Sequence, residues 1–141
     1  MDAKPLELVT EKLGNAGKTN LLDGATEAQI SEFEKENKLG LPLQYREWLL
    51  LADGGEFFLP AGVQLYGVAH SPMIDATDNN RPSSEYIVIG ALASGDPVLC
   101  MQTSEQISIF NKDAGRIESD EVYSDFLSFL NGLPELLGIE G

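Results

Sequence analysis

Apolar residues recur three or four positions apart in the first forty residues, which predicts two helices there. The first is expected over residues 3–13, and a polar linker over 14–24 follows it. The second is expected to begin at Thr26, because Thr26 and Gln29 fit a capping box in which each side chain bonds the backbone N–H of the other residue. Ile30 and Phe33 then fall on the inward face of this helix.

A third helix is predicted after Pro42, since proline suits the first turn of a helix, where its missing N–H is not needed. Apolar residues at i, i+3, i+4 and i+7 mark its inward face: Tyr45, Trp48, Leu49 and Ala52. Gly54 and Gly55 can adopt the left-handed backbone conformation and are expected to end it. Trp48 is expected in the core, with a partly exposed platform at the edge of a groove as the alternative. Tyr66 has the same two alternatives.

The pattern changes after Gly55 to short apolar or alternating runs that are typical of strands. Six segments are predicted as strands: 57–59, 63–66, 86–89, 97–102, 107–111 and 116–118. The run at 86–89 is β-branched throughout most of its length and predicts a central strand that is buried on both faces. Residues 70–84 are rich in Pro, Asn, Asp and Ser, and predict a long loop of the kind that often carries binding functions.

A last helix is expected to begin near Ser119 or Asp120, either of which can cap it. Its apolar face repeats at i, i+3, i+4 and i+7: Tyr123, Phe126, Leu127 and Leu130. Asn131 and Gly132 end it, and an apolar tail at 133–139 could cover a sheet edge. Helices first, then strands with short connections, then a closing helix predict an α+β domain over residues 1–141. Its antiparallel sheet should have about four to six strands.

Charge is the most unusual property of the composition. The 141 residues carry 9 Lys and Arg against 23 Asp and Glu, a net charge of −14. Residues 1–50 contribute −3, and residues 51–141 contribute −11. Such a surface keeps a protein soluble, or it attracts a basic partner. Direct nucleic-acid binding is disfavoured, because phosphate contacts need clustered Lys and Arg.

The residues needed for common catalytic or metal sites are scarce. The chain has one histidine, His70 in the long loop, and one cysteine, Cys100 in a predicted strand, so neither a Cys/His zinc cluster nor an internal disulfide is expected. Asp75 and Asp78 lack the regular spacing of a calcium loop. We therefore predict no catalytic residue, metal or cofactor. Neither a secretory signal nor a membrane span is recognisable, and a cytoplasmic location is expected.

Three groups of residues resemble the SUKH superfamily, which comprises cell-wall-assembly-regulator and toxin-immunity domains of microbes. The first group runs from the third helix to Leu65-Tyr66-Gly67, the second is a glycine-aspartate turn before a strand, and the third is the aromatic C-terminal segment. The residues are Pro42, Tyr45, Trp48, Gly54, Gly55, Tyr66 and Gly67, then Gly95 and Asp96, then Tyr123, Phe126 and Leu127. The resemblance covers roughly residues 24–131 and implies a domain that binds partners and is not an enzyme.

The resemblance and the charge together predict an immunity protein that binds and neutralises a cognate bacterial toxin domain, such as a basic nuclease. The acids expected to contact the partner are Glu56, Asp75, Asp78, Glu85, Glu118, Asp120 and Glu121. The alternative is a regulatory module that binds an endogenous protein. Neither hypothesis involves a direct contact with nucleic acid or membrane, and the oligomeric state stays open.

Overall fold

The computed structural model describes residues 4–58, 62–70, 73–74, 85–101 and 104–137. In these ranges the helices are α1 (Lys4–Ala16), α2 (Glu27–Asn37), α3 (Leu43–Leu51), α4 (Phe126–Asn131) and α5 (Leu133–Leu136). The strands are β1 (Asn20–Leu21), β2 (Gly55–Phe57), β3 (Val63–Leu65), β4 (Tyr86–Leu92), β5 (Pro97–Met101), β6 (Ile107–Asn111) and β7 (Arg116–Tyr123). Helices precede and follow the main strands, which confirms the predicted α+β class.

The strands form one antiparallel sheet in which every strand pairs with its neighbours in the sequence, from β1 at one edge to β7 at the other. The sheet has seven strands, more than the four to six expected. The strand without a counterpart among the six predicted segments is β1, a two-residue strand inside the predicted polar linker, where Asn20 pairs with Glu56 and Leu21 with Gly55. Ile87, Val88 and Ile89 of β4 are all buried, as predicted for a central strand covered on both faces.

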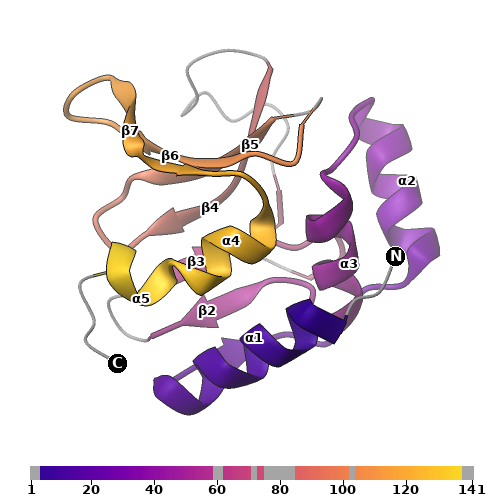
Figure 1. Cartoon of the computed structure of the whole chain (residues 1–141). Helices are drawn as coiled ribbons and strands as arrows, with labels where there is room; N and C mark the ends of the chain where they lie inside the picture. The colour runs from indigo at the N-terminus through magenta and orange to yellow at the C-terminus, as the bar shows by residue number, and fades with distance from the viewer. Residues whose placement is uncertain (1–3, 59–61, 71–72, 75–84, 102–103, 138–141) are drawn as a thin grey trace.

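The helices pack on one side of the sheet and enclose an aromatic core. Figure 1 shows α1, α4 and α5 on this side of the strands, with α3 beside them and α2 outermost, beyond α3. Rings from α3, β2 and α4 meet in the core: Tyr45, Trp48, Phe57, Phe126 and Phe129, all fully buried. Trp48 nevertheless satisfies its indole N–H, which donates to Thr10 Oγ1 of α1 at 3.1 Å. Trp48 is therefore a core residue, and the alternative of a partly exposed platform is wrong.

Both ends of α3 differ from the simplest expectation. Pro42 is its N-cap and provides no capping side chain, so the carboxylate of Glu105, from the connection between β5 and β6, accepts the backbone N–H groups of Leu43 and Gln44 at 2.7 and 3.0 Å. A carboxylate at this position also favours the positive end of the helix dipole. At the other end α3 stops at Leu51 with Ala52 as its C-cap, so the expectation that Gly54 and Gly55 end it is wrong: Gly55 is the first residue of β2, and Gly54 directly precedes it.

The predicted start of the last helix at Ser119 or Asp120 is wrong. Residues 116–123 form β7, which was expected to end at 118, and Tyr123 pairs with Ile107 of β6. The helix α4 begins three residues later, and Asp125 caps it by accepting the backbone N–H of Ser128 at 2.8 Å. Tyr123 still packs against this helix, edge-on to Phe129 with ring centroids 5.4 Å apart. The helical spacing that includes Tyr123 therefore reflects a shared core face and not a shared helix.

The first helix is also longer than predicted. It continues through Gly14 to Ala16, whereas the sequence suggested a stop near residue 13. The capping box of α2 is present as predicted: Thr26 N–H donates to Gln29 Oε1 at 2.9 Å and Gln29 N–H to Thr26 Oγ1 at 3.1 Å.

Candidate functional site

The predicted partner-binding acids lie on separate parts of the fold. Glu56 is on β2, Glu85 directly precedes β4, and Glu118, Asp120 and Glu121 are on β7. Strands β3 to β6 separate Glu56 from the acids of β7. Asp75 and Asp78 lie outside the described residues. The described acids therefore do not form one continuous cluster along the sheet, although those on β7 follow one edge of it.

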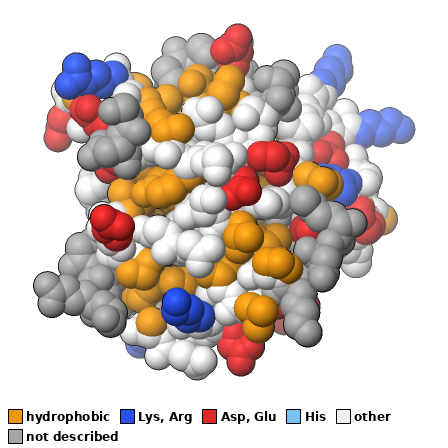
Figure 2. Space-filling model, in the orientation of Figure 1, with side chains coloured by type: hydrophobic (Ala, Val, Ile, Leu, Met, Phe, Trp, Pro, Cys, Tyr) orange, Lys and Arg blue, Asp and Glu red, His pale blue; other side chains and the backbone are white. Residues whose placement is uncertain are grey.

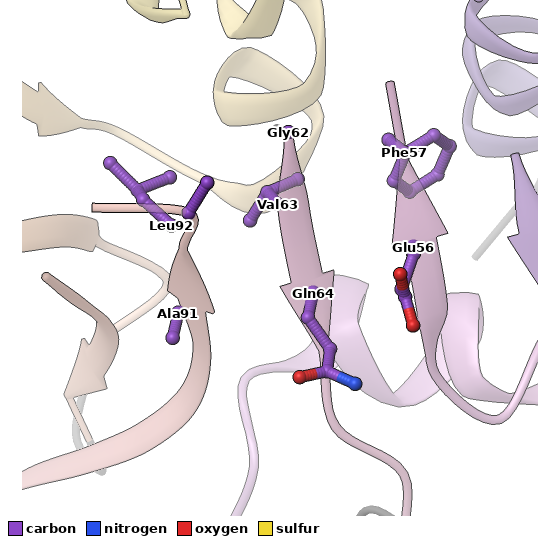
Figure 3. A pocket seen from close by; sticks show the side chains of 8 residues that line it. Glu56, Phe57, Gly62, Val63, Gln64, Ala91 and Leu92 are labelled. Carbon is purple, nitrogen blue, oxygen red and sulfur yellow. The ribbon is translucent and has the colours of Figure 1, made fainter. Parts of the chain in front are cut away.

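A small hollow lies over β2, β3 and β4, and Glu56 is on its wall (Figure 3). Glu56 pairs in register with Gln64, and Gln64 with Ala91, so these side chains are neighbours on one face of the sheet. The hollow measures about 180 Å³. Pockets for small molecules usually enclose roughly 300–1,000 Å³. This hollow is too small to favour a cofactor or substrate site.

Among the described residues, the Asp53 carboxylate accepts an unusually large number of hydrogen bonds, and nothing in the sequence had singled it out. It is fully buried between α3 and β2. Its carboxylate accepts the backbone N–H groups of Val68 at 2.7 Å, Ala69 at 2.8 Å and His70 at 2.6 Å. The ring Nδ1 of His70 lies 2.8 Å from the same carboxylate. Asp53 thereby fixes the path of the chain just after β3.

Several of the residues that resemble the family pattern lie near Asp53 and the chain segment that it holds: Tyr45, Gly54, Tyr66 and Gly67. Gly67 lies so close to Asp53 that a Cβ there would be 2.3 Å from the Asp53 carbonyl oxygen. Gly54 has φ +90° and packs against the backbone of Leu65 and Gly67, a conformation and a proximity that only glycine permits. The Tyr45 hydroxyl donates to the carbonyl of Tyr66. Burial raises the pKa of the Tyr45 phenol well above its usual value, which keeps this donor protonated.

His70 is held by a buried carboxylate, as the base of a catalytic triad would be, but a nucleophile would also be required. Among the hydrogen bonds between described residues, the ring of His70 has Asp53 as its partner. Cys100, the one cysteine of the sequence, is fully buried on β5, and burial raises the pKa of its thiol far above the usual value. A thiol in that state is a poor nucleophile. The described geometry therefore favours a structural role for Asp53 and His70.

A larger hollow lies between α2 and the chain segment that Asp53 holds. It measures about 510 Å³. One wall comes from α2 and the other from the residues after β3: Gln29, Glu32, Phe33, Glu36 and Asn37 on α2, then Val68, Ala69, Met73 and Ile74. We call this the α2 groove. Its apolar side chains and two carboxylates suit a polypeptide ligand better than a reaction centre.

The remaining scaffold residues are placed as follows. Gly95, with φ +96°, and Asp96 form the turn between β4 and β5, and the Asp96 side chain accepts the backbone N–H of Lys112 at 3.2 Å. Leu127, in the first turn of α4, donates its backbone N–H to Gln44 Oε1 at 2.8 Å. Tyr66 is partly buried and packs against the core.

Within the described ranges, no group of three or more His, Cys, Asp or Glu residues is arranged to hold a metal ion. The same residues include no helix with the length and apolar character required to cross a membrane.

A search of curated proteins found no match. The family described as SMI1 / KNR4 (SUKH-1) matches residues 24–132, well over half of the chain. This range includes every element from α2 to α4, and also Asp53 and the amides that it binds. The resemblance noted from sequence is thereby confirmed, and the chain belongs to the SMI1 / KNR4 family (SUKH-1).

Proposed function

We propose that this chain is a non-enzymatic protein-binding domain that acts as an immunity protein. It binds the toxic domain of a cognate bacterial toxin one-to-one and blocks the surface that the toxin uses. Membership of the SUKH-1 family is the observation that carries this proposal. We assign the whole chain, residues 1–141, to one such domain and expect it to act in the cytoplasm, where an incoming toxin would reach its target.

The negative charge of the chain favours a basic partner. Residues 51–141 carry a net charge of −11. Two of the described cations are already paired: Arg46 contacts Glu34 at 2.9 Å and Glu27 at 3.1 Å, and Arg116 contacts Glu118 at 3.3 Å. On the face drawn in Figure 2, acidic side chains are dispersed among apolar ones, and the described Lys and Arg side chains are scattered. A basic toxin domain, such as a nuclease, would be drawn to this surface, because complementary charge accelerates association.

The acids that contact the partner are, in this proposal, those of β2, of the long loop, of the position before β4 and of β7: Glu56, Asp75, Asp78, Glu85, Glu118, Asp120 and Glu121. The test of this placement is a triple reversal, in which Asp75, Asp78 and Glu85 become Lys. The matched control reverses three exposed acids of the N-terminal part: Glu7, Glu11 and Asp23. Both variants change the net charge equally. A loss of affinity and of salt dependence in the first variant alone supports the placement, and equal effects contradict it.

The function itself is tested by co-expression with the product of the neighbouring gene, followed by co-purification at low and high salt. We expect a single stoichiometric partner with a toxic C-terminal domain, and survival of cells that otherwise die. Recovery of an endogenous housekeeping protein without rescue would favour a regulatory module instead. Failure of rescue with every neighbouring toxin would contradict the immunity role.

A further inference from the structure

The helix α2 has one face that is fixed to the rest of the fold. Ile30 on this face is fully buried. Arg46 of α3 reaches across to α2, where its guanidinium bonds Glu27, Glu34 and Ser31 at 2.9–3.1 Å. These contacts hold α2 against α3, on the outside of the molecule (Figure 1). They leave a second face of the helix directed away from α3.

That second face forms one wall of the α2 groove. Gln29, Glu32, Phe33, Glu36 and Asn37 follow the i, i+3, i+4, i+7, i+8 spacing of a single helix face. Phe33 packs against the core, as predicted for an inward position, but stays partly exposed and supplies the apolar part of the wall. Glu32 and Glu36 are exposed one helical turn apart, and the described residues that line the groove include no Lys or Arg.

The opposite wall is built to keep its shape. Asp53 accepts hydrogen bonds from Val68 and Ala69, and the Ile74 N–H donates to the Gly67 carbonyl at 2.9 Å. Met73 lies on this wall with 51% of its surface exposed, a large apolar side chain in contact with solvent. A preformed wall lowers the entropy that binding must cost. Methionine adapts its shape to different apolar partners and is frequent on binding surfaces.

We propose that the α2 groove is the docking site for an exposed segment of the partner protein that presents one large apolar side chain between Lys or Arg residues. The apolar side chain lies between Phe33 and Met73, and the basic residues pair with Glu32 and Glu36. A second copy of this chain is an unsuitable occupant, since two molecules of net charge −14 repel each other. The inference rests on the proposed function and adds to it the place where the partner's apolar side chain binds. The acids of the long loop and the strands would then act mainly on the rate of encounter.

A short synthetic peptide tests the groove without any knowledge of the toxin. The probe has a central Leu flanked on each side by Lys-Arg, and the control peptide carries Ser in place of Leu at the same charge. Binding is followed by the methyl resonances of the chain's three methionines and by backbone amide shifts. We expect saturable shifts of the Met73 methyl group and of amides at 32–37 and 68–69, with the Leu peptide only. No shift of Met73 at millimolar peptide, or equal shifts with both peptides, would overturn the proposal.

A second test uses the partner obtained by co-purification. Met73→Ala and the double change Glu32→Gln with Glu36→Gln should each weaken binding about tenfold. Matched controls are Leu8→Ala, at a side chain 58% exposed on α1, and Glu7→Gln with Glu11→Gln, an exposed pair with the same helical spacing. The controls should leave affinity unchanged. A partner that binds all four variants equally well would refute the groove but leave the binding function intact. If no partner exists, the proposed function fails and the peptide titration alone decides the groove.

Discussion

Asp53→Asn is the change that most directly tests how the chain after β3 is held in place. The fully buried carboxylate accepts three backbone N–H groups and contacts the ring of His70, which is itself exposed to solvent. Asparagine retains one acceptor oxygen. Its amide NH₂ must therefore face the N–H of Val68 or those of Ala69 and His70. One charge-assisted hydrogen bond is lost, worth about 1.5–3 kcal/mol, and a buried donor is left unsatisfied.

We expect the variant to lower the free energy of unfolding by about 2–4 kcal/mol while the protein still folds. The assay is urea denaturation followed by the fluorescence of the single tryptophan, Trp48, which is fully buried. Amide hydrogen exchange should also accelerate at 68–70 well before exchange in the central strands, since the wall of the α2 groove loses its support. Binding of the Leu peptide should weaken in parallel.

The matched control is Asp113→Asn, in the exposed turn between β6 and β7. Both substitutions remove one negative charge from a chain of net charge −14. If relief of charge repulsion were the only effect, both variants would be as stable as the unaltered protein or slightly more stable. If Asp53→Asn behaved like Asp113→Asn, with no change in exchange at 68–70, the reasoning about this carboxylate would be refuted.

Three further variants test other parts of the fold. Gly90→Ala would place a Cβ 2.3 Å from the Gln64 carbonyl oxygen and should cost about 2–3 kcal/mol in urea denaturation, whereas Gly40→Ala, with no atom within 4 Å of its new Cβ, should cost far less. Asp125→Ala removes the N-cap of α4 and should cost about 1 kcal/mol by the same assay; a neutral result would contradict the placement of the helix start. Burial raises the pKa of the Cys100 thiol, so the unfolded chain loses this proton at a lower pH than the folded chain. The free energy of unfolding is therefore unaffected by ionisation of this thiol below about pH 8 and declines above the ordinary thiol pKa of about 8.5. When unfolding is measured from pH 7 to 10, stability should fall less steeply in Cys100→Ala than in the unaltered chain.

Local patterns predicted those elements whose stabilising contacts are close in the sequence. The capping box at Thr26 joins residues three positions apart, and the apolar face of α3 is set by a helical repeat over eight residues. The glycine-aspartate turn at Gly95 and Asp96 is likewise signalled by its own residues. Each of these was found where it was expected, because the chemistry that forms it is contained within one segment.

The start of the last helix was misjudged because periodicity reports burial and not hydrogen bonding. Tyr123 and Phe129 bury neighbouring rings in the same core, and this produces a helical spacing although Tyr123 belongs to β7. Nothing within residues 116–123 announces a strand of that length, since its pairing partner is β6. The short strand β1 escaped notice for the same reason.

The sequence by itself determined the α+β class, the antiparallel connections, the family and the excess of negative charge. Only the tertiary structure decided which polar side chains hold the start of α3 and the chain after β3 in place. Glu105 caps α3 from 62 residues away in the chain, and Asp53 binds amides 15 to 17 residues beyond it. The α2 groove likewise joins residues 29–37 with 68–74. These acceptors and walls depend on how the elements pack, and a buried carboxylate has no sequence signal that tells it apart from the many exposed ones in so acidic a chain.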